Sequence, residues 1–375
     1  MGRVRLIQKG ALPMKRKKEL LRCLALLALS LTAGLGLSLY PETALQGAAA
    51  GLDVCLSVLV PSLFPFLVLS VFLVRSGASS LLGRILEKPT RLLFRLPGCC
   101  APVILMGMIG GYPVGARGAA SLLRTGDVTE EEAGRLTLFC VNAGPAFVLS
   151  AVGARFLHSA RAGGILLASS LTASLLLGLL LRGRGSVRLP RRTASQAART
   201  GAGEALVASV SDACRSLVVM CCFVVLFSVV LAFLSLLLPP GMFFSCLSAV
   251  LEVTGGCRDL SAAGAPPWAL AAALGWGGLC VQLQILSLPG TPRLPLWKFS
   301  LARLAHAALA AFVSLPLCTL LPPDVAAQPV FSNTTSQAAP ALAASPAAAA
   351  ALLLSCAVFL AAGGRWNEGR RPLPR

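Results

Sequence analysis

The stretch that decides the fold is residues 99–124, CCAPVILMGMIGGYPVGARGAASLLR. It consists of two short apolar pieces that meet at Gly110, Gly111 and Pro113. A hydrocarbon core of about 30 Å needs roughly 20 apolar residues in one helix, and neither piece is that long. Non-helical backbone survives at membrane depth only where protein or a water-filled cavity satisfies it. We therefore predict a re-entrant hairpin over residues 98–124 that leaves the membrane on the side it entered.

Composition indicates that the whole chain is built for lipid. Of its 375 residues, 56% are hydrophobic and 13% are charged, and the mean hydropathy is +0.80, which is unlike a soluble domain. We predict an all-α, polytopic membrane protein with about eight transmembrane helices and two re-entrant hairpins. The second hairpin is expected over residues 241–262. The helices are expected at about Leu20–Tyr40, Leu52–Val74, Leu136–Phe156, Gly164–Leu181, Leu217–Leu238, Trp268–Leu288, Ser300–Leu321 and Pro346–Ala362.

The formal charge of +19 is explained by topology. The basic residues cluster at the ends of apolar runs without interleaved aromatic residues, which is the positive-inside pattern rather than a nucleic-acid surface. A polybasic contact with the lipid surface is the alternative. The expected segments are a basic cytoplasmic N-terminus (1–19), a first membrane half (20–181), a basic cytoplasmic loop (182–202), a second membrane half (203–321), an external Ala/Pro/Ser-rich loop (322–345), and a last helix with a basic cytoplasmic tail (346–375).

The two membrane halves are expected to have opposite orientations. The first hairpin is entered from the cytoplasmic side and the second from the outer side, and each is followed by a full helix. This is the inverted-repeat arrangement of secondary transporters, whose binding sites lie near the midplane where broken helices meet.

Several prolines and glycines interrupt the apolar runs. Proline removes a backbone donor and glycine tolerates unwound conformations, so the backbone groups freed there can bind a solute or a partner. Ordinary kinks or tight helix contacts are the alternative for any single break. The predicted helix-break residues are Pro61, Pro65, Gly111, Pro113, Gly144, Pro145, Gly255 and Gly277.

Glu252 is the first candidate for a solute-binding residue, because it is the one acid inside an apolar stretch and such groups face a cavity or a partner. A shallower position, with its carboxylate in headgroup water, is the alternative. Asn142 and Gln282 are further candidates, although amides in membrane helices more often bond to a neighbouring helix. Tyr112 and Thr254 complete the predicted substrate site, since each lies in a predicted hairpin.

Catalytic and cofactor motifs are missing from the sequence. No Walker A sequence, nucleophile elbow, HExxH pair or dinucleotide fingerprint occurs. The thirteen cysteines lack the paired spacing of a metal or redox site. We therefore expect no enzymatic activity, no cofactor and no metal.

Five strings together carry a family resemblance: PSLFPFLVLSVFL (61–73), MGMIGGYPVGARGA (106–119), LFCVNAGPAFVLSAVG (138–153), LEVTGG (251–256) and WGGLCVQLQ (276–284). They resemble the nucleoside-recognition (Gate) domain family of bacterial membrane proteins, and in particular its sporulation members. The resemblance implies a fold like that of concentrative nucleoside transporters and a role in building the spore cortex. It also implies the mother-cell or forespore membrane of a spore-forming bacterium.

Two functional hypotheses follow. The first is a transporter-like protein that moves or senses an unknown small solute during spore cortex formation. The second is a non-transporting scaffold that organises other sporulation membrane proteins around the spore envelope. In both, the lipid bilayer is the surrounding partner and nucleic acid is not.

Overall fold

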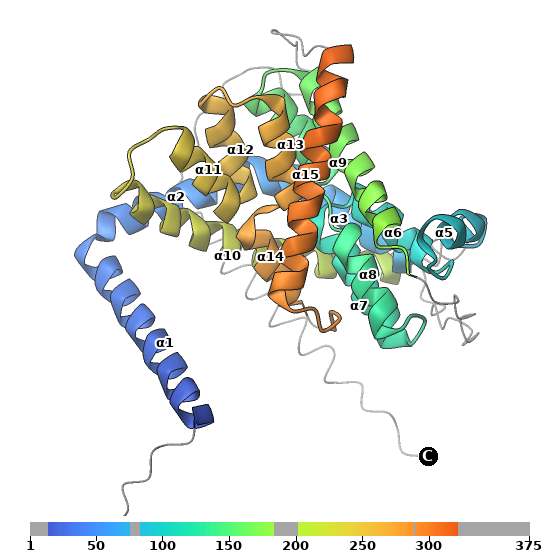
Figure 1. The fold of residues 1–375 in the computed structure, drawn as a ribbon, viewed down its shortest axis with the longest axis horizontal. Coiled ribbons are helices and arrows are strands. Elements are labelled where there is room, and N and C mark those ends of the chain that lie inside the picture. Colours follow the sequence, from blue (N-terminus) through green and yellow to red (C-terminus); the bar gives the residue numbers. More distant parts are fainter. Residues whose placement is uncertain (1–13, 76–82, 184–201, 289, 322–375) are drawn as a thin grey trace, which may run out of the picture.

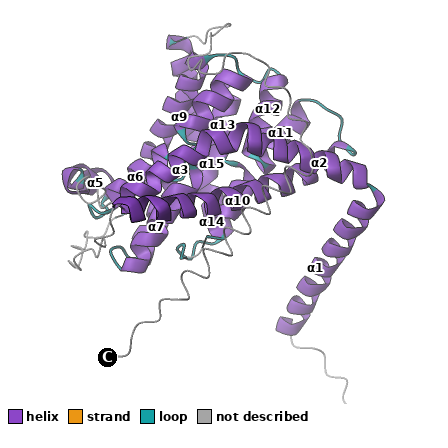
Figure 2. Ribbon diagram, turned by 180° about the vertical axis from the view of Figure 1, so that it is seen from behind, coloured by secondary structure: helices purple, strands orange, loops and turns teal. Residues whose placement is uncertain are grey.

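The computed structural model describes residues 14–75, 83–183, 202–288 and 290–321 (Figure 1). Throughout this part of the chain all regular secondary structure is helical (Figure 2). The predicted external loop 322–345 and the predicted helix and tail at 346–375 lie outside the described residues, as does most of the basic loop 182–202.

The helices of the first half are α1 (Met14–Leu39), α2 (Pro41–Val54), η1 (Cys55–Leu59), α3 (Val60–Arg75), α5 (Glu87–Phe94), α6 (Cys100–Ile109), α7 (Tyr112–Thr125), α8 (Glu130–Phe139), η2 (Phe147–Phe156) and α9 (Ala160–Leu180). Those of the second half are α10 (Ala202–Ser235), α11 (Met242–Leu251), α12 (Val253–Ala262), α13 (Pro267–Trp276), α14 (Gly278–Leu286) and α15 (Leu296–Leu320). The segments η1 and η2 are wound as π-helix.

Five stretches of helix within the described residues are long and apolar enough to cross a bilayer, or six if the bent pair formed by α2–η1 and α3 counts as one span. The protein is therefore a multi-pass α-helical membrane protein, as the composition predicts. The helix α1 projects away from the body of the molecule (Figures 1 and 2). The five stretches are Leu20–Leu39, Ala160–Leu180, Gly203–Ser235, Pro267–Leu286 and Leu296–Leu320.

The expected helix over Leu52–Val74 differs from the structure. Helix already begins at Pro41, and the path bends by 55° between η1 and α3. Pro61 follows the π-helical turn, and it cannot donate to the carbonyl of Ser57 four residues earlier. Arg155 Nη1 donates to that carbonyl instead, at 3.3 Å.

The helix expected over Leu136–Phe156, which contains the predicted break residues Gly144 and Pro145, is divided, because α8 ends at Phe139 and η2 begins at Phe147. Pro145 has no amide with which to bond the carbonyl of Val141, four residues earlier, so the helix opens between them. The expected helix Trp268–Leu288 is likewise divided, at Gly277, where the backbone has a φ of 75°. In addition, α10 begins at Ala202, well before the predicted Leu217.

Two pairs of short helices fold back on themselves. In the pair α6–α7, Gly107 lies against Gly115 and Gly118 lies against Val103, so the two helices run antiparallel. In the pair α11–α12, Gly256 lies against Ala249 in the same manner. These pairs occupy the ranges predicted as hairpins, and we call them the first and second hairpin. Their re-entrant placement in the bilayer stays a prediction.

The same order of elements occurs twice along the chain: a long helical path, a hairpin, a broken helix and a long helix. The long paths of the two halves pack on each other, α10 against α2 and α3, and α15 against α9. The second helix of each hairpin contacts the broken helix of the other half, α7 with α14 and α12 with η2. The two halves therefore share one interior rather than forming separate domains.

Candidate functional site

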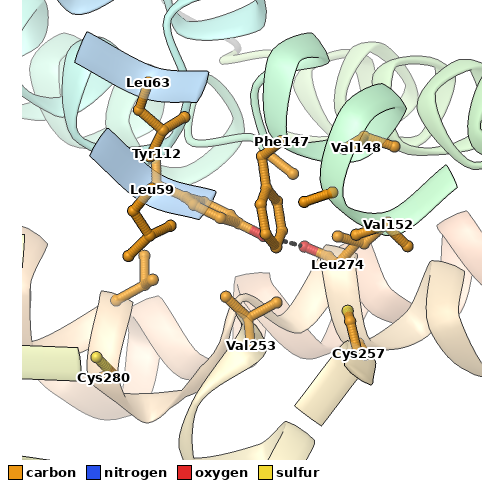
Figure 3. Close-up of a cluster of buried hydrophobic side chains, with 14 of the residues drawn as sticks. Leu59, Leu63, Tyr112, Phe147, Val148, Val152, Val253, Cys257, Leu274 and Cys280 are labelled. Carbon is orange, nitrogen blue, oxygen red and sulfur yellow. Dashed lines mark hydrogen bonds between the residues drawn. The ribbon is translucent and has the colours of Figure 1, made fainter. Parts of the chain in front are cut away.

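The tips of the two hairpins lie at one cavity. The first hairpin contributes Gly110 to Pro113, and the second contributes Glu252 to Thr254. The remaining lining residues come from the breaks and the long helices: Leu59, Leu63, Leu67, Gly144, Phe147, Met220, Val224, Cys280, Val281 and Gln284. A cluster of apolar side chains surrounds this point (Figure 3).

The cavity is small in this conformation. Measured as the space open to the centre of a water molecule, its volume is about 30 Å³. One water needs roughly 10–15 Å³ on that measure, so about two waters fit. A larger solute requires the walls to separate.

Tyr112 ties the first hairpin to the second half of the chain. Its side chain is buried, and its hydroxyl donates to the carbonyl of Leu274 in the last turn of α13 at 2.9 Å (Figure 3). The ring also lies beside Gly277, where an added Cβ would come within 3.2 Å of it. The tip of the first hairpin and the break between α13 and α14 are therefore in direct contact.

Glu252 ends α11 and caps α12. Its carboxylate accepts hydrogen bonds from the amides of Thr254 at 2.8 Å and Gly255 at 2.6 Å. An acid at a helix N-terminus satisfies free amides and interacts favourably with the helix dipole. The residue is only 2% exposed, and no Lys or Arg of the described residues forms a salt bridge with it. The two helices meet at Glu252, and Gly255, a predicted break residue, lies in the first turn of α12.

Thr254, a predicted substrate-site residue, lines the cavity, and Gln284 joins it from α14; substrate binding there stays a prediction. The Gln284 amide donates to Cys280 Sγ at 3.2 Å. The cavity thus combines a carboxylate, a hydroxyl and an amide with otherwise largely apolar walls.

The structure does not bring Asn142 and Gln282 to the cavity. Asn142 Nδ2 reaches the carbonyl of Phe139 at 3.5 Å and Ser174 Oγ at 3.1 Å. Gln282 Nε2 reaches the carbonyl of Trp276 at 3.4 Å, and its Oε1 accepts from Ser300 Oγ at 2.7 Å. Asn142 therefore bonds to the end of α8, and Gln282 bonds to the end of α13. In each case this is the helix that precedes the break.

Arg303 is a buried residue beside the two helix breaks that was not predicted from the sequence, and it does not line the cavity. It lies in α15, is 1% exposed, and donates through Nε and Nη2 to the carbonyl of Gly275 at 3.0 and 2.7 Å. Its Nη1 donates to the carbonyl of Val141, which Pro145 leaves without its helical partner. One guanidinium therefore bonds to the broken helices of both halves, at the C-terminal side of α8 and of α13, where a cation is favoured by the helix dipole.

His306 orients this arginine. Its Nδ1 bonds to Arg303 Nη2, and because a guanidinium only donates, the ring must accept there. The proton then sits on Nε2, which donates to the carbonyl of Ser170 at 2.9 Å. The signal in the sequence was an Arg and a His three residues apart inside the apolar run Ser300–Leu321.

Of the other predicted break residues, two lie in close contact with each other and one lies inside a continuous helix. Gly111, with a φ of 85°, and Gly144 approach each other so closely that a Cβ on Gly144 would come within 3.1 Å of the Gly111 amide. The tip of the first hairpin thus rests on the first broken helix. In contrast, Pro65 lies inside α3 without ending it.

Comparison with known proteins gives one curated relative. The chain is 28% identical over 318 residues to "Sporulation integral membrane protein YlbJ" of Bacillus subtilis (strain 168), with 74% of this chain and 78% of that protein covered. No protein-family model matches the chain, and no solved structure is significantly similar to it. The chain is therefore similar to a sporulation membrane protein, which agrees with its multi-pass architecture. Membership of the Gate domain family stays a prediction.

Proposed function

We propose that this protein moves or senses a small solute during spore formation, at the cavity between the two hairpin tips. The observation that carries the proposal is that both halves of the chain contribute their hairpin tips to one cavity containing the Glu252 carboxylate. A carboxylate has about four acceptor sites, and two of them are used by backbone amides. The sporulation role is taken from the name of the similar Bacillus subtilis protein.

The repeated order of elements supports a transporter-like inverted repeat. In such proteins the substrate site lies between the repeats, where short helices begin and end at mid-membrane depth. Here α7 begins at Tyr112 and α12 begins at Val253, and both residues line the cavity. We propose that the termini are cytoplasmic and that the two hairpins dip into the bilayer from opposite sides.

A second candidate is a scaffold for other sporulation membrane proteins, and the small size of the cavity favours it. Space for about two waters is what a fold with a disused site would retain. Substitution distinguishes the candidates: a scaffold tolerates Glu252→Gln and Thr254→Ala, both at the cavity, in sporulation assays but loses function when the basic loop from Arg182 to Arg199 is altered.

Flux into proteoliposomes tests the transport reading. Purified protein is assayed with a panel of nucleosides, peptidoglycan precursors and small cations. We expect flux or saturable binding of at least one member, and a loss of about tenfold or more in Glu252→Gln, since a hydrogen bond to a charged group is worth roughly 1.5–3 kcal/mol. Glu42→Gln is the matched control, because Glu42 is exposed at the start of α2. If the wild-type protein shows no flux and no binding with any member of the panel, the proposal is overturned.

A further inference from the structure

The interface between α3 and α10 leads away from the cavity. The lining residues Leu59, at the end of η1, and Leu63 and Leu67, in α3, are four apart along the chain. On α10, Val224 and Met220 have the same spacing. Since α3 and α10 pack on each other, both rows of buried side chains belong to one interface.

Continuing both rows by two steps of four residues leads to an ion pair. On α3 the row runs through Val71 to Arg75, and on α10 it runs through Ser216 to Asp212. Arg75 Nη2 and Asp212 Oδ2 lie 2.5 Å apart. Eight residues of helix rise about 12 Å, so the pair lies roughly two turns from the cavity along the α3–α10 interface.

The first hairpin adds a third connection at the same place. Pro113 lines the cavity, and Arg117, one turn later in α7, donates through Nη1 to the carbonyl of Asp212 at 3.2 Å. Ser216 Oγ donates to that carbonyl as well, at 2.6 Å. We call Arg75, Arg117, Asp212 and Ser216 the Asp212 cluster.

The exposure of the side chains increases across the cluster. Ser216 is buried, whereas the side chains of Arg75 and Asp212 are 42% and 38% exposed. We propose that the Asp212 cluster closes an access route that runs from the end of α3, between α3 and α10, to the cavity. What passes along this route rests on the proposed function, but the route itself does not.

Cys280 provides a native probe of the route, because it lines the cavity and is fully buried. Full-length protein in nanodiscs is treated with a small charged methanethiosulfonate, and modification of each cysteine is followed by peptide mass spectrometry. A closed site is modified at a rate set by the fraction of molecules that are open. We expect slow modification of Cys280 in the wild type.

Breaking the ion pair should accelerate this modification. For Asp212→Asn and for Arg75→Met we expect an increase of about two- to fivefold, the range for one partly exposed ion pair. The double variant should be no faster than either single variant, since both remove the same interaction. Unchanged rates, or increases that multiply in the double variant, would overturn the proposal.

Two controls separate opening of the route from general loosening. Cys257 is buried near the cavity without lining it (Figure 3), and it should stay unmodified in every variant. Glu87→Gln breaks the Arg91–Glu87 pair of α5, whose side chains have similar exposure, 34% and 42%, and it should leave Cys280 protected. Modification of Cys257 in step with Cys280 would contradict a local route. Because no solute is used, a negative result here leaves the flux experiment unaffected.

Discussion

Two arginines bond to the backbone carbonyls that prolines leave without a helical partner. Pro61 leaves the carbonyl of Ser57 free, and Arg155 bonds to it. Pro145 leaves the carbonyl of Val141 free, and Arg303 bonds to it. A buried carbonyl without a partner costs about 1–3 kcal/mol, so the bond from Arg303 makes the break after α8 tolerable inside the protein, whereas Ser57 and Arg155 are exposed.

Substitution of Arg303 tests this account. Arg303→Met should lower the thermal stability of the purified protein clearly, because it orphans the carbonyls of Val141 and Gly275. The loss of about 1–3 kcal/mol for each carbonyl is offset in part because a buried charge is also removed. Arg155→Met is the matched control. Arg155 is exposed and donates to a single carbonyl, so the melting temperature of this variant should differ little from that of the wild type. Equal decreases in melting temperature for Arg303→Met and Arg155→Met would contradict this role of Arg303.

The sequence predicts some site residues and not others for a geometric reason. Tyr112, Glu252 and Thr254 follow from the hairpin tips, and all three line the cavity. Gln282 and Gln284 lie two residues apart, which is about 200° around a helix, so one faces the cavity and the other faces α15. Periodicity alone does not say which. Arg303 was missed because its partners are backbone carbonyls brought close only by the tertiary fold.

At the scale of elements, glycines allow the first hairpin to approach the first break. A Cβ on Gly107 or on Gly115 would lie 2.1 Å from the carbonyl oxygen of Cys140. No real Cβ approaches an oxygen so closely, so backbone would have to move. The hairpin and the unwound segment after α8 therefore form one packed unit.

Alanine substitution tests this packing. Gly107→Ala and Gly115→Ala should each destabilise the protein by about 1–3 kcal/mol, as overpacking does, and should lower its melting temperature. Gly164→Ala is the control within α9, where an added Cβ meets nothing within 4 Å. It should be neutral or slightly stabilising, since alanine is the better helix former. Tolerance of alanine at both hairpin positions would contradict the packing described.

The ends of helices could be predicted where the length of an apolar run determines whether it can span the membrane. The short pieces of the hairpins are too short to span, and the long helices α9 and α15 end close to their expected limits. The two broken helices were each expected within the length of one span, with the predicted break residues Gly144, Pro145 and Gly277 inside them. Their tertiary partners, Arg303 at the first break and Tyr112 at the second, could not be predicted from length or composition.

At the scale of the whole molecule, the cavity exists because the two halves pack together. The hairpin of each half contacts the broken helix of the other, α7 with α14 and α12 with η2, and Arg303 bonds to both breaks. Neither half alone could surround the cavity. This reciprocal packing is what a protein that changes access to a shared site requires.

Cross-linking between the hairpin tips tests the central claim most directly. Pro113→Cys and Thr254→Cys are introduced together into a full-length chain whose native cysteines are replaced, and a short bifunctional thiol reagent is applied in membranes. The shared cavity predicts an efficient cross-link within one chain, and no cross-link when Thr254→Cys is paired with a cysteine at Glu42. Failure of the first pair to cross-link, although each cysteine reacts singly, would contradict a cavity formed by both tips.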